Sequence, residues 1–202
     1  MGSNRWQSRQ AADPYVKAAQ SQGYRSRAAF KLDELDRKDR FLRAGQRIVD
    51  LGAAPGGWSQ IAAERVGATG RIVAMDLLPM EPLPSVEFIQ GDFREPEVLS
   101  ALESLVGDRV DLVLSDMAPN ISGVSARDQA MSIDLAEMAL EFAQEWLEPT
   151  GVFVVKLFQG AGFDEFVTGV RSDFGRVRLR KPPASRKESR EIYLVADSRR
   201  RM

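Results

Sequence analysis

Lys156 lies within an apolar stretch, GVFVVKLFQG at residues 151–160, that is typical of a buried strand. An unpaired ammonium is costly to desolvate, so a lysine at this position needs a partner or a chemical task. Asp116 ends an earlier apolar stretch, RVDLVLSD at residues 109–116. If the two stretches are neighbouring parallel strands, both charges lie at the same edge of a sheet. The pair is then either a structural ion pair or part of a reactive site, and spacing alone favours neither.

The chain contains no histidine and no cysteine. This composition excludes thiolate nucleophiles, the usual imidazole base, and zinc sites with nitrogen or sulfur ligands. Any proton transfer must therefore depend on Lys, Asp, Glu or Tyr. The absence of cysteine is also compatible with a reducing cytosol.

A glycine-rich turn, DLGAAPGGW at residues 50–58, follows the first apolar stretch. Small residues let the backbone approach a ligand closely, and the helix expected behind the turn offers free amide donors. The spacing differs from the dinucleotide fingerprint G-x-G-x-x-G, because Pro55 lies inside it. Taken alone, the turn is also explained as an ordinary tight turn.

Two carboxylates follow the turn at positions where a nucleoside needs acceptors. Asp76 ends the next strand about 20 residues later, where a carboxylate commonly binds ribose hydroxyls. Asp92, in QGDF, could accept from an adenine amino group, although a turn-forming or capping role explains it equally well. Nicotinamide dinucleotide and S-adenosylmethionine both contain such a nucleoside. The missing dinucleotide fingerprint favours S-adenosylmethionine.

Short apolar strands alternate with amphipathic helices along the chain, which predicts an α/β fold with a mostly parallel sheet and helices on both faces. The seven expected strands are residues 47–52, 71–76, 86–92, 109–116, 152–158, 176–181 and 190–196. The last two have no helix between them, which predicts an antiparallel edge strand. The main expected helices are residues 58–66, 96–106, 128–147 and 163–174, preceded by a helix that contains Lys31.

With 202 residues and 44% apolar content, the chain can bury one full core, so we expect a single domain over residues 24–202. Residues 1–23 are expected to be loosely ordered. No apolar run is long enough to span a bilayer, and the start of the chain lacks the apolar segment of an export signal. We therefore expect a cytoplasmic protein without a membrane partner, and a monomer.

The net charge of −1 conceals two basic flanks around an acidic middle. Residues 1–47 hold 11 Lys and Arg against 5 Asp and Glu, and residues 171–202 hold 11 against 4. One interpretation is a set of solvated helix faces. The other is a single basic surface formed by both ends of the chain, which would suit RNA or DNA.

Seven motifs occur in order along the chain: YRSRAAFKL, VDLGAAPGGWSQ, LLPM, GDF, SDMAPN, VVKLFQG and KPPASRKESREIYLV. Together they closely resemble the bacterial FtsJ family of large-subunit ribosomal RNA 2′-O-ribose methyltransferases, over about residues 24 to 195. The resemblance implies a Rossmann-like class I methyltransferase fold that uses S-adenosylmethionine. It also implies the substrate, which is a uridine in the A-loop of 23S ribosomal RNA within the assembled 50S subunit.

The family has a Lys-Asp-Lys-Glu catalytic tetrad, and the resemblance carries its four positions over to Lys31, Asp116, Lys156 and Glu191. The family's contacts to S-adenosylmethionine carry over to Gly56, Trp58, Asp76, Asp92 and Asp116. No position in either set departs from the family's motifs.

By the same resemblance, Lys156 acts on the ribose hydroxyl, which needs a base or an orienting group as it attacks the methyl carbon. Burial and a neighbouring Lys31 ammonium favour the neutral amine, whereas Asp116 and Glu191 favour the charged form. The sequence leaves both roles for Lys156 open. No metal is expected, because the methyl group of a sulfonium is already activated.

Five basic residues lie in the loops expected nearest Lys31 and Glu191, and we expect them to bind RNA phosphates: Arg25, Arg27, Arg186, Lys187 and Arg190. Solvated loop charges are the alternative. Three rival functions remain: a methyltransferase for transfer RNA or an mRNA cap, a non-enzymatic RNA-binding protein, and a dinucleotide oxidoreductase. We expect no room for an added recognition domain, which favours the ribosomal enzyme, and the filled tetrad argues against the non-enzymatic protein.

Overall fold

The computed structural model describes residues 13–120 and 122–200. Its helices are α2 (Pro14–Gln22), α3 (Ala28–Asp39), α4 (Gly57–Val66), α5 (Pro96–Val106), α6 (Ser125–Trp146) and α7 (Phe163–Asp173), with a short 3-10 turn η1 (Gly67–Thr69). Its strands are β1 (Arg47–Leu51), β2 (Arg71–Asp76), β3 (Val86–Gln90), β4 (Val110–Ser115), β5 (Leu147–Phe158), β6 (Phe174–Arg180) and β7 (Glu191–Arg199).

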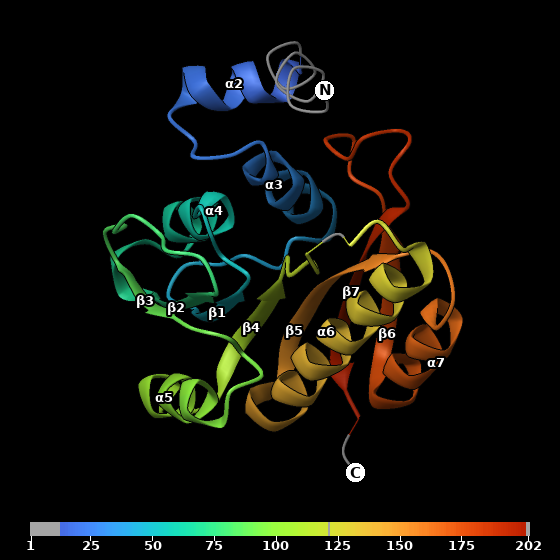
Figure 1. Cartoon of the computed structure of the whole chain (residues 1–202). Helices are drawn as coiled ribbons and strands as arrows, with labels where there is room; N and C mark the ends of the chain where they lie inside the picture. Colours follow the sequence, from blue (N-terminus) through green and yellow to red (C-terminus); the bar gives the residue numbers. More distant parts are fainter. Residues whose placement is uncertain (1–12, 121, 201–202) are drawn as a thin grey trace.

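The seven strands form one sheet in the order β3-β2-β1-β4-β5-β7-β6 (Figure 1). Neighbours from β3 to β5 pair in parallel, and β7 pairs antiparallel with both β5 and β6. The expected mostly parallel seven-stranded sheet with an antiparallel edge region is therefore confirmed. Because no helix separates β6 from β7, the chain reverses there, and β7 inserts between β5 and the outermost β6.

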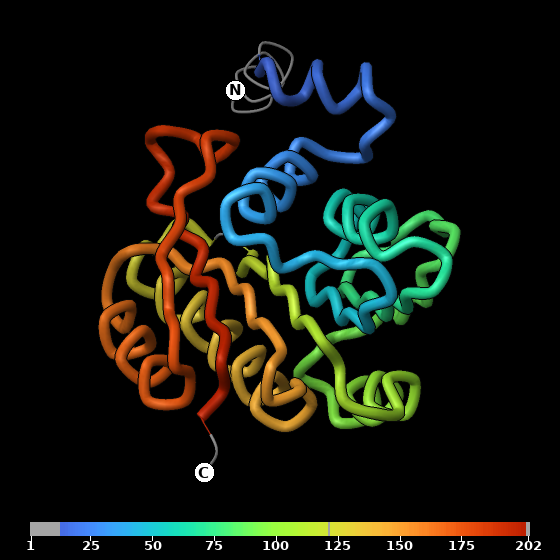
Figure 2. The backbone as a smooth tube through the Cα atoms, turned by 180° about the vertical axis from the view of Figure 1, so that it is seen from behind, coloured from blue at the N-terminus to red at the C-terminus, as the bar shows by residue number. Residues whose placement is uncertain are grey.

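Alternate strand residues pack into two cores, one on each face of the sheet. Val49, Val113 and Phe153 belong to the core beneath α5, α6 and α7. Ile48 and Leu112 belong to the core beneath α3 and α4. Figures 1 and 2 show these helix layers from opposite sides. A side chain's place in the strand alternation therefore decides which helix layer it contacts.

Helix α2 corrects the expectation that residues 1–23 are loosely ordered, for residues 14–22; residues 1–12 lie outside the described residues. The Asp13 side chain accepts a hydrogen bond from the backbone of Tyr15, Pro14 occupies the first turn, and Gly23 ends the helix at φ 75°. An Asp-Pro start and a glycine stop are ordinary helix signals. The sequence therefore contained the information, and the polar composition of the segment obscured it.

Among the helices of the described residues, none is long and apolar enough to cross a membrane.

Candidate active site

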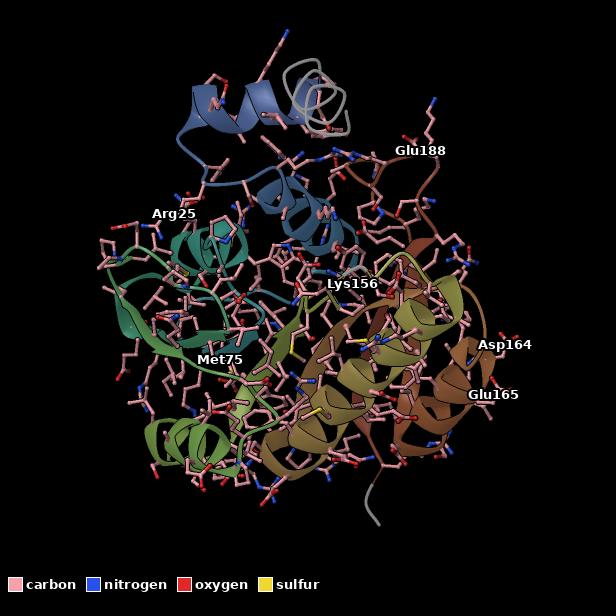
Figure 3. All side chains as sticks on the ribbon, viewed as in Figure 1. Arg25, Met75, Lys156, Asp164, Glu165 and Glu188 are labelled. Atoms are coloured by element: carbon pink, nitrogen blue, oxygen red, sulfur yellow. The ribbon has the colours of Figure 1, made fainter. Side chains whose placement is uncertain are left out.

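Strand register places the predicted tetrad on the α3 side of the sheet, at the carboxyl ends of the parallel strands. Lys156 lies two residues after Val154, which is part of the core beneath α3 and α4, so its side chain faces the same layer. Tyr193 of β7 is directly opposite Lys156. Ser115 pairs with Val155 at the end of β4, so Asp116 follows level with Lys156. Figure 3 shows Lys156 near the upper end of β5, below α3.

The four tetrad side chains form two ion pairs that a tyrosine connects. Lys156 Nζ lies 3.1 Å from Asp116 Oδ1 and also donates to the Asp116 backbone carbonyl. Lys31 Nζ donates to Glu191 Oε2 at 2.8 Å and to the Tyr193 hydroxyl at 3.3 Å. The Tyr193 hydroxyl in turn donates to Asp116 Oδ1 at 2.8 Å. The structure thus brings together all four residues, which lie far apart in the sequence.

Burial makes these contacts strong, because charges interact more strongly away from water. Lys156 is 8% exposed and Glu191 is 7% exposed. Burial, followed by the charges of Asp116 and Glu191, raises the pKa of Tyr193 well above its ordinary value. Tyr193 therefore stays protonated and remains a hydrogen-bond donor to Asp116.

Sequence reasoning missed Tyr193, although a signal for it was present. Residues two apart on a strand face the same side, so Tyr193 had to share a face with Glu191. An aromatic residue in a strand is usually interpreted as core, and its ring is indeed fully buried. Only its hydroxyl belongs to the site.

A cavity of about 370 Å³ lies beside the tetrad and shares Asp116 with it. Its walls come from the residues that follow β1 to β4 and from one face of α6. Leu77, Leu78 and Met117 supply apolar surface, while Asp76 and Asp92 supply carboxylates. An apolar pocket of this size with a few acceptors fits a nucleoside-containing cofactor.

Asp76 connects two segments at the edge of this cavity. Its Oδ2 accepts from the backbone of Ala54 in the glycine-rich turn at 2.9 Å, and its Oδ1 accepts from the backbone of Leu78 at 2.8 Å. In the same turn, Gly52 has φ +78°, and a Cβ there would lie 2.8 Å from the backbone nitrogen of Met117. Glycine is therefore required for the turn to approach the end of β4 this closely.

Asp92 is held by Arg94, another residue that lines the cavity. Asp92 Oδ1 accepts from Arg94 Nε at 2.9 Å and from the Arg94 backbone at 3.0 Å. The side-chain hydrogen bond from Arg94 lowers the pKa of Asp92 below its ordinary value. Asp92 therefore presents a carboxylate to the cavity at neutral pH.

Gly56 and Trp58 are not among the residues that line the cavity. The Trp58 indole is 2% exposed, donates to the Ala28 carbonyl at 2.9 Å, and packs against Tyr193 with ring centroids 5.6 Å apart. Gly56 lies before α4 at φ 108°, where a Cβ would be 3.0 Å from Met80 Sδ. That either residue contacts the cofactor stays a prediction. In this structure Trp58 supports α3 and Tyr193, and Gly56 packs closely within the turn.

The five predicted RNA-binding residues divide into two sets. Arg25 donates to the carbonyls of Pro55, Glu81 and Pro82. Arg27 pairs with Asp13 and donates to the Ala184 carbonyl. Both guanidinium groups are therefore committed to contacts within the protein.

The second set has exposed side chains in the loop between β6 and β7, beside α3 (Figure 1): Arg186, Lys187 and Arg190. These three are the better candidates for phosphate contacts. Arg186 Nε lies 3.9 Å from Asp13 Oδ2, which is the outer limit of an ion pair.

Asp50 is a buried carboxyl group on β1 that faces α4. Ser59 Oγ donates to its Oδ2 at 2.6 Å, and within the described part of the chain its Oδ1 has no hydrogen-bond partner. Burial, the largest cause, raises the pKa of Asp50 from 3.8 to about 7. Between these two pH values, the folded protein therefore retains a proton on Asp50 that the unfolded chain releases.

We expect Asp50→Asn to stabilise the protein more at about pH 8 than at about pH 5. In the wild type, the contribution of Asp50 to stability falls by about 1.4 kcal/mol per pH unit between its unfolded and folded pKa values, and then levels off. Asparagine cannot ionise, so the variant lacks this loss and still accepts from Ser59. Urea unfolding at both pH values measures it, with Asp164→Asn on the exposed surface of α7 as the control (Figure 3). An equal effect of Asp50→Asn at both pH values would contradict the raised pKa.

The chain is similar to known proteins over nearly its whole length. The family model of FtsJ-like methyltransferases matches residues 24–199. "Ribosomal RNA large subunit methyltransferase E" of Marinobacter nauticus is 56% identical over 195 residues, covering 96% of this chain and 94% of the relative. The protein of the same name from Methylobacillus flagellatus is 55% identical over 199 residues, covering 98% and 96%.

Solved structures show the same fold. A crystal structure described as a ribosomal RNA methyltransferase of Plasmodium falciparum has a TM-score of 0.77 at 33% identity, covering 86% of this chain and 97% of that one. A structure described as an rRNA methylase of Clostridium thermocellum has a TM-score of 0.56 at 19% identity, covering 80% and 93%. The second likeness concerns the fold alone.

Proposed function

The chain belongs to the FtsJ-like methyltransferase family, and from this premise we propose that it methylates the ribose 2′-hydroxyl of a uridine in large-subunit ribosomal RNA. The names of both bacterial relatives support a ribosomal substrate over transfer RNA or an mRNA cap. In finer detail, we propose that the uridine lies in the A-loop of 23S RNA within the assembled 50S subunit. We also propose that the enzyme is a cytoplasmic monomer and that residues 24–202 form its methyltransferase domain. The linked tetrad beside the cavity is the observation that carries the proposal.

S-adenosylmethionine is the methyl donor, and when bound it supplies a methyl group activated by its sulfonium centre. Asp76 and Asp92 would hold its ribose and adenine, because their carboxylates line the cavity. Asp116 belongs to both the cavity and the tetrad, so the proposed cofactor site and the proposed catalytic site are adjacent. Gly56 would contribute to cofactor binding by shaping the glycine-rich turn, and Trp58 by supporting α3 and Tyr193.

We assign to Lys156 the task of activating the ribose hydroxyl. Its Nζ donates to the Asp116 backbone carbonyl and lies 3.1 Å from Asp116 Oδ1, so Asp116 holds the amine beside the cavity that Asp116 also lines. As a neutral amine, Lys156 would take the hydroxyl proton while the oxygen attacks, and Asp116 would stabilise the ammonium that forms. As an ammonium, Lys156 would orient the hydroxyl and stabilise the negative charge that develops on its oxygen.

The choice of substrate is testable by offering the purified protein and a labelled methyl donor three RNAs in parallel. Large ribosomal subunits that lack the modification should be labelled, whereas bulk transfer RNA and capped mRNA should not. Preferential labelling of transfer RNA or capped RNA would contradict the ribosomal assignment.

Alanine replacement of the three exposed cations Arg186, Lys187 and Arg190 should weaken RNA binding and reduce its salt dependence. Each lost phosphate contact lowers the slope of log K against log salt by about 0.7 for single-stranded RNA. Binding of S-adenosylhomocysteine should not change, because these side chains are remote from the cavity lining.

Arg43→Ala is the matched control for this experiment. Arg43 is also exposed, but it precedes the amino end of β1, away from the predicted RNA surface. Filter binding at several salt concentrations gives both slopes. An unchanged slope in the triple variant would show that these cations are only solvated loop charges.

A further inference from the structure

We propose that Ser185 is a positioning residue for Glu191, and thereby for Lys31, in the methyl transfer reaction. The inference rests on the proposed function and deepens it, because it assigns a task to the segment between β6 and β7. This segment covers residues 181–190 and is called the β6–β7 loop below.

Ser185 holds the Glu191 carboxylate from the side opposite Lys31. Ser185 Oγ donates to Glu191 Oε1 at 2.7 Å, and Lys31 Nζ donates to Oε2 at 2.8 Å. Ser185 is 6% exposed, so water does not readily replace its hydroxyl. With one oxygen fixed by Ser185, the carboxylate cannot rotate freely, and its other oxygen stays directed at Lys31. The Ser185 hydroxyl therefore positions the Lys31–Glu191 ion pair without being part of it.

The position of Ser185 is determined by α3, the helix that carries Lys31. The backbone of the preceding residue, Ala184, donates to Glu34 Oε2 at 2.7 Å and accepts from Arg27. Glu34 lies one turn after Lys31 on α3, so both side chains reach the same neighbouring segment. The Ser185 backbone also donates to the Pro182 carbonyl at 2.8 Å, which closes a turn. One helix thus supplies both the lysine and the anchor for the serine that orients its partner.

The outer side of the same loop carries the exposed cations, including Arg186 next to Ser185. Lys181 Nζ donates to the Ser189 carbonyl at 2.6 Å and holds the two ends of the loop together. Figures 1 and 2 both show the loop beside α3. The loop therefore presents charge outward and the Ser185 hydroxyl inward, which places the proposed RNA contacts next to the residue that orients Glu191.

The test compares Ser185→Ala, Ser185→Thr and Ser189→Ala in methyl transfer to large subunits. Ser189 is the matched control, because its Oγ accepts from the Glu191 backbone at 3.2 Å and does not touch the carboxylate. We expect Ser185→Ala to lower kcat about tenfold, since a buried carboxylate loses a donor. The KM for the subunit and the Kd for S-adenosylhomocysteine should stay within about twofold. Ser185→Thr, which keeps the hydroxyl, should recover most of kcat, and Ser189→Ala should resemble wild type.

A structural role for Ser185 gives a different pattern. If Ser185→Ala raises KM and lowers kcat together, with a fall in Tm, the serine only maintains the fold of the loop and the proposal is overturned. Wild-type kcat in Ser185→Ala also overturns it, and so does an equal loss in Ser189→Ala. If the wild-type protein transfers no methyl group, the proposed function fails and the inference fails with it.

Discussion

Lys156→Ala should lower the rate of methyl transfer by a factor of about 10² to about 10⁴, while S-adenosylhomocysteine binds with nearly unchanged affinity. The variant lacks the amine that we assign to the ribose hydroxyl and that Asp116 holds in place. The cavity should keep its shape, since Lys156 is not among its lining residues. Tyr193 still donates to Asp116 and limits the cost of leaving that carboxylate without its lysine.

Single-turnover transfer and calorimetric titration of S-adenosylhomocysteine measure the two effects separately. Lys156→Met keeps the volume of the side chain without the amine and should be as inactive as Lys156→Ala. Lys38→Ala, which removes an exposed lysine from the last turn of α3, is the control for loss of a positive charge. If transfer and cofactor binding fall equally in both Lys156 variants, Lys156 is a structural residue.

Asp76→Ala should have the second largest effect, on cofactor binding. We expect the Kd for S-adenosylhomocysteine to rise by about 10²-fold, equivalent to about 2.7 kcal/mol. The variant loses the predicted acceptor for the ribose, and it also releases the backbones of Ala54 and Leu78, which both line the cavity. Transfer at saturating methyl donor should change much less, because Asp76 does not contact the tetrad.

Asp134→Asn is the matched control for Asp76. Asp134 lines the same cavity from α6 but makes no hydrogen bond to the glycine-rich turn in the described residues. Calorimetric titration of both variants gives the comparison. Similar losses of affinity would show that the cavity responds to net charge, and that Asp76 has no specific task there.

The sequence predicted the sheet and the proximity of Asp116 and Lys156 because both depend on patterns that are local in the chain. Apolar strands that end next to the glycine-rich turn, at Asp76 and just before Asp116 identify the carboxyl edge, and parallel pairing brings those ends together. Lys156 was conspicuous because a charge inside an apolar strand is costly. Lys31 and Glu191 were ordinary surface charges by pattern, and only the family's motifs singled them out.

The remaining features depend on contacts between segments far apart in the sequence, which no local pattern encodes. Arg25 and Arg27 had the composition of an RNA-binding segment, yet their guanidinium groups are used by carbonyls of residues 55, 81–82 and 184. The resemblance gives Trp58 a cofactor contact, which stays a prediction, and only the fold shows its ring packed against Tyr193. Ser185 is one of several serines in the chain, and only the fold shows its hydroxyl on Glu191.

The position of the transferred methyl group tests the central claim most directly. Large subunits that lack the modification are incubated with the protein and a labelled methyl donor, and their RNA is digested to nucleosides for mass spectrometry. The proposal predicts label in 2′-O-methyluridine alone, and initial labelling at least about 10²-fold slower with Lys156→Ala. Label on a base carbon or nitrogen, or an undiminished rate without Lys156, would contradict a tetrad that acts on the ribose hydroxyl.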